Sequence, residues 1–377
     1  MKRVTVPFFI SHQGCPHTCI FCDQRLISGA GGSLPTPAEI VEKIEKWRST
    51  AGARPLEVAF FGGSFTALPE SKQAELLAPL QPLLKRGVLS AVRLSTRPDC
   101  IDDRCVAYLS EMGVRTIELG VQSMDDQVLA ASGRGHTAAA SEAAIACIRK
   151  HGLQVGAQLM PGLPGDTPAS SLTTLERVIS AGVDFIRIYP TVVLRSTGLA
   201  KRYADGNYVP LGFEEGLFLC KILLHRAMQA GLKVIRIGLQ ADDGLNSQSV
   251  LAGCWHPALG QLVRSQLYGD LLCQMVSRVP DAVSVVVKCN TKRISDVIGL
   301  SKENLKRMQL RGRDVAVVAD DGLLEEELCF EFSTREHLNQ NMQTSPLPPC
   351  GGGLGWGGSC CEDTKMVLHP PPDPLPS

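Results

Sequence analysis

The sequence lacks a net charge, a membrane-length apolar run and a disulfide framework. Its 377 residues include 38 basic and 38 acidic side chains, so bulk charge does not indicate a nucleic-acid-binding protein, and any such role must depend on a local patch. No uninterrupted apolar run approaches the roughly 18 residues of a membrane helix. The apolar run near the N-terminus is also too short for a signal peptide. We therefore expect a soluble, cytoplasmic protein that does not bind a membrane.

Fourteen cysteines are many for this chain, yet they are scattered rather than spaced as a disulfide scaffold. With 44% hydrophobic residues, the chain can form a large core of more than about 200 residues and needs no such scaffold. A reducing compartment fits these cysteines best.

Three of the cysteines stand close together in the loop SHQGCPHTCIFCDQ, directly after the apolar run Val4–Ile10. Cys15, Cys19 and Cys22 form a C-x3-C-x2-C pattern, and three thiolates so close can converge on one metal centre. A four-iron cluster is normally held by four cysteines, so three would leave one iron without a protein thiolate. An open coordination position distinguishes a catalytic metal site from a closed structural one.

Other interpretations of this loop stay open. Zinc usually takes four ligands, and His12 or His17 could complete a zinc site around Cys22. Unligated thiols are a further alternative, whereas a disulfide is disfavoured because the number of cysteines is odd. In the iron–sulfur interpretation, Phe21 would form an aromatic wall beside the cluster.

Short apolar runs rich in β-branched residues alternate with helical patterns over about the first 190 residues. The predicted strands are Val4–Ile10, Leu56–Phe61, Ala91–Thr96, Val114–Val121, Leu153–Met160 and Phe185–Tyr189. Strands separated by helices of about 10–15 residues indicate βαβ units and a parallel sheet. The pattern favours an α/β fold, a partial (β/α)6 TIM-like barrel, over a doubly wound sheet. In either architecture, ligands bind at the carboxyl ends of the strands.

Unusual residues follow these strands, where a ligand would bind. Gly62 and Gly63, before Ser64, would let a ligand approach the backbone, although a plain turn is the alternative. Arg97 could bind a carboxylate or pair with Asp99.

The fourth predicted strand and the segment after it also contain polar residues of interest. Glu118 lies inside an apolar run, where an acid is costly without a partner. A ribose or an ammonium ligand would explain it, and so would a structural salt bridge. Arg134 and His136 could reach a substrate, but a helix entry with Thr137 as N-cap and a solvated His136 is favoured.

Six motifs follow one another between residues 10 and 205: GGSFT, STRPD, ELGVQS, GRGHT, QLMPGLP and IRIYPTVVLRSTGL. In this order they resemble the radical S-adenosylmethionine (SAM) domain of the elongator catalytic subunit, and the three-cysteine loop resembles the cluster loop of the radical SAM superfamily. The resemblance implies a [4Fe-4S] cluster and SAM, cleaved reductively to a 5′-deoxyadenosyl radical. It also implies a reducing partner such as ferredoxin or flavodoxin, and a tRNA base, the wobble uridine, as substrate.

The same resemblance implies roles for particular residues. Cys15, Cys19 and Cys22 would ligate the cluster. The residues implied for the SAM and substrate cavity are Gly62, Gly63, Ser64, Thr96, Arg97, Glu118, Gln122, Gln158 and, closing the strand-end face, Tyr189.

The sequence departs from the elongator subunit in three respects. Its first two cysteines are not separated by a long insertion, and no acetyl-CoA loop of the Q/R-x-x-G-x-G/A type follows residue 205. Because the first predicted strand starts at Val4, we also expect no basic N-terminal extension of the kind that grips tRNA. We therefore expect an elongator-type barrel without the acetyltransferase domain. Two alternatives stay open: a small-molecule substrate, as in the oxygen-independent coproporphyrinogen oxidases, which share the G-L-P-G run of residues 162–165, and a non-catalytic metal-binding protein.

Four regions are expected along the chain. They are a radical SAM core barrel in residues 1–205, a mainly helical extension in 206–280, a small basic α/β unit in 281–340 and a disordered Gly- and Pro-rich tail in 341–377. The basic unit could follow an RNA backbone, or form a solvated helix face balanced by the acidic run Glu325–Glu327.

Overall fold

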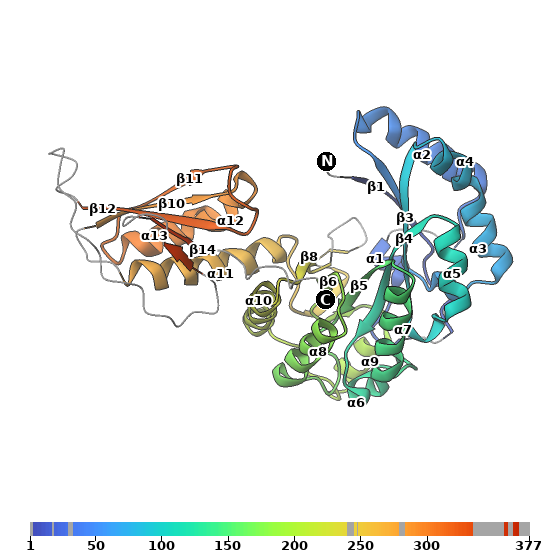
Figure 1. Ribbon diagram of the computed structural model, residues 1–377. Helices are drawn as coiled ribbons and strands as arrows, with labels where there is room; N and C mark the ends of the chain where they lie inside the picture. The colour runs from blue at the N-terminus through green and yellow to red at the C-terminus, as the bar shows by residue number, and fades with distance from the viewer. Residues whose placement is uncertain are drawn as a thin grey trace. The chain divides into compact units, whose positions relative to one another are not determined.

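The structure is a computed structural model (Figure 1) and describes residues 3–16, 19–28, 33–239, 245–246, 248–278, 283–334, 358–360 and 365–368. The chain divides into two compact units, Met1–Leu219 with Lys233–Pro257, and Cys220–Leu232 with Ala258–Ser377. None of the helices in the described ranges combines the length and hydropathy needed to span a bilayer.

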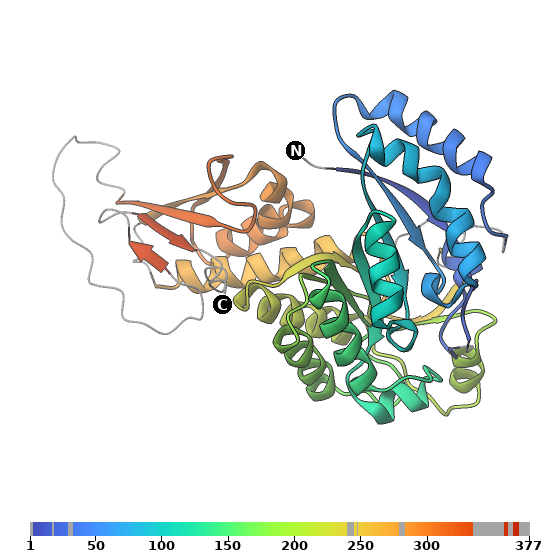
Figure 2. The same ribbon diagram turned by 45° about the vertical axis from the view of Figure 1, so that its right-hand side comes forward.

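A seven-stranded parallel sheet organises the first unit and confirms the predicted α/β partial barrel. The strand order β1-β2-β3-β4-β5-β6-β8 follows the chain, and β1 and β8 form the two edges of a curled, open sheet. The strands are β1 Val4–Phe9, β2 Leu56–Phe61, β3 Leu89–Thr96, β4 Val114–Gln122, β5 Gln154–Leu159, β6 Phe185–Ile188 and β8 Lys233–Ile237. The helices that follow the strands cover one side of this sheet (Figure 2).

The sheet has one strand more than the six predicted. β8 pairs in parallel with β6, so the sheet continues beyond residue 205, where the barrel was expected to end. A separate antiparallel pair, β7 Val192–Leu194 with β9 Val250–Gly253, also belongs to this unit.

The helices begin and end where local sequence rules place them. Thr36 caps α2 in a capping box with Glu39, whose side chain accepts from the Thr36 backbone N–H at 2.7 Å. The helical segment from Glu70 to Lys85 is divided into three pieces, because Pro79 and Pro82 cannot donate the backbone hydrogen bonds of a continuous helix. The α-helices up to residue 229 are α1 Gln24–Ser28, α2 Pro37–Ala51, α3 Glu70–Leu77, α4 Gln81–Lys85, α5 Asp103–Glu111, α6 Asp126–Ala131, α7 Ala138–Lys150, α8 Pro168–Ser180, α9 Gly198–Ala204 and α10 Phe213–Gln229.

The second unit contains a small α/β extension, as predicted. Its sheet has the order β11-β10-β12-β14-β13, with β10 parallel to β11 and antiparallel to β12. Its elements are α11 Leu259–Val276, β10 Val283–Cys289, α12 Ile294–Ile298, α13 Glu303–Gln309, β11 Val315–Ala319, β12 Leu328–Thr334, β13 Gly358–Cys360 and β14 Lys365–Leu368. The expected disorder of residues 341–377 lies mostly outside the described residues, but β13 and β14 are strands, not disordered chain.

Candidate metal and cofactor site

The three-cysteine loop packs its backbone against the turn that follows β2. Gly14 adopts a φ of +72°, and a Cβ added there would lie 2.3 Å from the Ser64 carbonyl oxygen. A Cβ on Gly63 would lie 2.5 Å from the carbonyl oxygens of both Gln13 and Ile10. Only glycine therefore permits this approach. The absence of a side chain at Gly63 lets the turn after β2 pack against the three-cysteine loop. The contact of Gly63 with SAM stays a prediction.

Each cysteine of the loop has a different environment. Cys15 is exposed, with its Sγ 3.6 Å from Ser64 Oγ, whereas Cys19 is buried and its Sγ accepts from Arg134 Nη1 at 3.3 Å. Burial, with the nearby Cys19 and Cys15 sulfurs, raises the pKa of the Cys22 thiol to about 12. A bound metal would have to displace that proton. Because the Cys15 and Cys19 sulfurs lie near enough to affect the Cys22 thiol, the three can act as one ligand set.

The geometry of the loop disfavours zinc. His12 Nε2 already accepts the Gln24 backbone N–H at 2.9 Å, and His17 lies outside the described residues. A zinc ion with Zn–S bonds of about 2.3 Å would hold its sulfurs about 3.8 Å apart. Among the described residues, only a different trio brings three potential ligand atoms within 4.8 Å of one another, so the loop sulfurs are spread more widely.

The structure places Phe21 in the same apolar cluster as Cys19, and its expected role as an aromatic wall beside a metal cluster stays a prediction. It is buried in one apolar cluster with Cys19, Val128, Leu163 and Leu199. The cluster excludes water from one side of the cysteine loop.

Beside Cys19 lies a group of buried side chains with incomplete hydrogen bonding, which we call the Arg134 corner: Arg97, Gln122, Arg134 and His136. Arg134 Nη2 donates to the Gly120 carbonyl at 2.5 Å, while its Nε has no acceptor among the described residues. Arg97 binds Asp99 with two hydrogen bonds of 2.9 Å and also donates to the Arg134 carbonyl, yet its Nη1 has no acceptor of good geometry in the part of the chain that the structure describes.

The hydrogen bonding of the other two side chains of the Arg134 corner, Gln122 and His136, is also incomplete. Gln122 Oε1 and both ring nitrogens of His136 lack hydrogen-bond partners of good geometry within the described chain. Burial and the charge of Arg134 lower the pKa of His136 to about 4, against smaller opposing effects of Asp99 and the Val121 backbone, so its ring is neutral near pH 7. Buried polar groups are normally satisfied, so a cluster of exceptions marks a place for a ligand.

The structure shows that the expected solvation of His136 was wrong and that the expected N-cap at Thr137 is present. His136 is 7% exposed rather than solvated. Thr137 does cap α7, because its Oγ1 accepts the Ala140 N–H at 3.2 Å. The burial of Arg134 and His136 was not evident from the sequence. There, the two residues only alternate with Gly133 and Gly135 before the N-cap residue Thr137.

Gln122 also carries backbone strain. Its φ is +67°, in the left-handed region that side chains other than glycine rarely adopt. The strain coincides with a shift in the β4–β5 register between Leu119 and Gln122. Local strain of this kind is common where a fold positions a functional side chain.

In a second set of buried polar side chains, the charged groups are paired with one another. We call this set the Glu118 network: Glu57, Arg93, Glu118, Gln158 and Arg187. Glu118 is fully buried, and Arg187 donates to both of its oxygens at 2.6 and 2.9 Å. Arg93 and Gln158 add hydrogen bonds of 2.9 and 3.3 Å. The two arginines lower the pKa of Glu118 despite its burial. Of the two interpretations left open, the structure shows the salt bridge, and a role in binding SAM stays a prediction.

The remaining predicted residues are placed as follows. Thr96 is buried and its Oγ1 lies 2.6 Å from Thr66 Oγ1. Tyr189 is partly buried, and its hydroxyl accepts from Arg187 Nη1 at 3.5 Å. Both neighbours are protein groups, so their predicted contacts with SAM or substrate stay untested.

Comparison with known proteins identifies the family. The model of the Radical SAM superfamily matches residues 9–178, and the Radical SAM C-terminal domain model matches residues 183–269. Together these spans cover more than half of the chain, and the chain belongs to the radical SAM superfamily.

Within that superfamily, the chain resembles the radical SAM region of elongator-type proteins. It is 28% identical over 247 residues to the tRNA uridine(34) acetyltransferase of Methanocaldococcus infernus, covering 54% of this chain and 46% of that one. An uncharacterized protein of Methanocaldococcus jannaschii is 28% identical over 225 residues, 56% of this chain and 69% of that protein. The archaeal Elp3 of Methanocaldococcus infernus, solved with an N-terminal deletion, shares the fold with a TM-score of 0.57 at 18% identity, covering 89% of this chain and 75% of that one. The chain thus spans less than half of the acetyltransferase.

Proposed function

We propose that this chain is a radical SAM enzyme that binds a [4Fe-4S] cluster through Cys15, Cys19 and Cys22 and binds SAM beside it. The observation that carries the proposal is the contact of Arg134 with the Cys19 sulfur, made by a buried guanidinium that still has an unpaired N–H. When bound, the cluster supplies the electron that cleaves SAM to methionine and a 5′-deoxyadenosyl radical.

The Arg134 corner has the polarity needed to bind an amino-acid group. Arg97 and Arg134 each offer a buried N–H without an acceptor, which suits a carboxylate. Gln122 Oε1 is a buried acceptor without a donor, which suits an ammonium. The Gln122 and Arg134 side chains are neighbours, since both lie about 3 Å from the position of a Cβ on Gly120, at 3.0 and 3.1 Å. SAM has both charged groups at one end.

Anaerobic reconstitution tests the proposal. Purified protein supplied with iron and sulfide should hold about four irons per chain and should produce 5′-deoxyadenosine from SAM under strong reductant. Alanine at any of the three cysteines should abolish both properties, whereas Cys273→Ala, which removes a partly buried thiol on α11, should change neither. An intact cluster that gives no 5′-deoxyadenosine would leave the non-catalytic alternative, and zinc in place of iron would contradict the proposal.

A base of tRNA, the wobble uridine, is the proposed substrate class. The support comes from relatives named as tRNA uridine(34) acetyltransferases and from the elongator-like motifs. A reducing partner such as ferredoxin or flavodoxin would supply the electron.

Ion pairing in the second unit limits where RNA could bind. Six of its described basic residues pair with acids at 2.6–3.4 Å: Lys221, Arg264, Lys288, Lys292, Arg293 and Arg307. Lys302, Lys306 and Arg311 make no ion pair within the described residues, so each is a cation that a phosphate backbone could bind.

A tRNA-binding assay at low salt follows from this division. Neutralising Lys302, Lys306 and Arg311 together should weaken binding, and the matched variant Lys292→Gln should have a smaller effect because Lys292 is already paired with Glu325. Absence of tRNA binding at low salt would favour a small-molecule substrate.

A further inference from the structure

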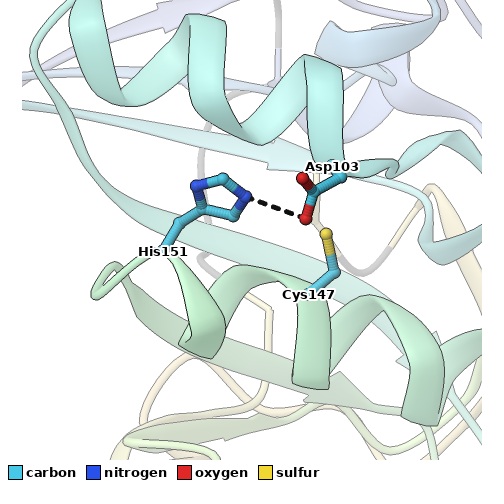
Figure 3. A group of neighbouring side chains, drawn as sticks. All are labelled: Asp103, Cys147 and His151. Carbon is cyan, nitrogen blue, oxygen red and sulfur yellow. Dashed lines mark hydrogen bonds and ion pairs between the residues drawn. The ribbon is translucent and has the colours of Figure 1, made fainter.

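Three potential metal ligands meet where α5 and α7 lie side by side (Figure 3). Asp103 is the first residue of α5, and Cys147 and His151 are four residues apart at the end of α7, so they share one face of that helix. The Asp103 carboxylate, the Cys147 sulfur and a His151 ring nitrogen all lie within 4.8 Å of one another. His151 Nε2 is 3.1 Å from Asp103 Oδ1.

These atoms match the ligand chemistry of zinc. Carboxylate oxygen, thiolate sulfur and imidazole nitrogen are its usual protein ligands. A tetrahedral ion with bonds of about 2.0 Å to O and N and about 2.3 Å to S needs ligand atoms about 3.3–3.6 Å apart, so shifts of about 1 Å would complete the site. Asp103 is exposed and the other two residues are partly buried, which leaves a fourth position open to water.

A cation already occupies the Asp103 carboxylate. Lys150 Nζ lies 2.8 Å from Asp103 Oδ1, on a side chain that is 70% exposed. A solvated lysine can swing away at little cost, because exposed ion pairs contribute at most about 1 kcal/mol. Metal binding would exchange one cation for another at this carboxylate.

We infer that Asp103, Cys147 and His151 bind a single Zn²⁺ that ties the start of α5 to the end of α7. The site is built from elements other than the three-cysteine loop, and the inference does not depend on the proposed function.

Cobalt(II) substitution tests this site in the full chain. Cys15, Cys19 and Cys22 are replaced by alanine to remove the competing thiols, and the protein is titrated anaerobically with Co²⁺. One equivalent should bind with a sulfur-to-cobalt charge-transfer band and the intense visible absorption of a tetrahedral ion, and Zn²⁺ should displace it. Absence of the charge-transfer band would overturn the inference.

Three further variants in the same background assign the ligands. Cys147→Ser should abolish the band and weaken binding by more than about 100-fold, since even outer-shell partners of a metal contribute about 10–100-fold. Cys273→Ser, the matched thiol control, should leave both unchanged. Lys150→Gln should tighten binding roughly two- to five-fold by removing the competing ammonium. A band that survives Cys147→Ser, or no tightening in Lys150→Gln, would contradict the inference.

Discussion

The Glu118 network and the Arg134 corner are both buried and charged, yet they differ in completeness. Each Glu118 oxygen accepts hydrogen bonds from two side chains, and the network joins residues of β2, β3, β4, β5 and β6. In the Arg134 corner, by contrast, each of the four side chains keeps at least one buried polar atom that has no hydrogen-bond partner of good geometry within the described ranges.

We interpret this difference as a division of roles within one sheet, in which the Glu118 network supports the fold and the Arg134 corner binds a ligand. A network whose charges satisfy one another has little left to offer a ligand, and it is expected to fix strands in register. A corner with unpaired donors and acceptors has a cost that a bound ligand can offset. The four predictions below test that distinction, from the largest expected effect to the smallest.

Breaking the Glu118 network should have the largest effect on stability. Glu118→Gln would leave Arg93 and Arg187 buried beside a neutral amide, and we expect the free energy of unfolding to fall by about 3–5 kcal/mol. Urea denaturation of the cluster-free protein measures this. Glu142→Gln, which removes an exposed pair with Arg177, should cost at most about 1 kcal/mol. Equal effects in the two variants would contradict the structural role of Glu118.

The lowered pKa of the buried His136 should make the stability of the protein depend on pH. Its folded pKa of about 4 lies below the ordinary 6.5, so the unfolded chain takes up the proton first as the pH falls. The contribution of His136 is therefore complete above about pH 6.5 and is lost as the pH falls toward 4, by up to about 3 kcal/mol. Denaturation of the wild type and His136→Gln at a series of pH values isolates this slope. Parallel curves for the two proteins would refute the assignment.

Sequence alone predicted the sheet because each strand and helix obeys local rules. All six expected strands are present, and the α/β partial barrel follows from their alternation with helices. The place of β8 in the same sheet could not be predicted in that way. It follows β6 only after β7, α9 and α10, so its pairing depends on tertiary structure.

The hydrogen-bonding state of the site was not predictable for a related reason. Glu118 is 25 residues from Arg93 and 69 from Arg187, so its sequence neighbours gave no indication that it was fully paired. Arg134 is 115 residues from Cys19, and no local pattern joins them. The three cysteines could be proposed as metal ligands from the sequence because they lie within eight consecutive residues.

Removing Arg134 should affect SAM binding more than stability. Arg134→Met would delete two hydrogen bonds but also a buried charge and an unpaired N–H, so we expect the unfolding free energy to change by at most about 1 kcal/mol. SAM affinity should fall by roughly 10–100-fold, the value of a hydrogen bond to a charged group. Calorimetric titration of the reconstituted protein measures it, with the exposed Arg202→Met as control. A large loss of stability with unchanged SAM affinity would show that Arg134 supports the fold and does not bind SAM.

The smallest expected effect concerns the strained backbone of Gln122, and two substitutions at that position separate strain from side-chain function. Glycine tolerates a φ of +67°, so Gln122→Gly should raise the unfolding free energy by about 0.5–1 kcal/mol. Gln122→Ala retains the strain and should give no such gain. Both variants lose Oε1, the acceptor assigned to the SAM ammonium, and should therefore weaken SAM binding equally. If alanine were the more stable of the two, the left-handed conformation would not be strained. The Arg134 corner would then be distinguished by its unpaired polar atoms alone.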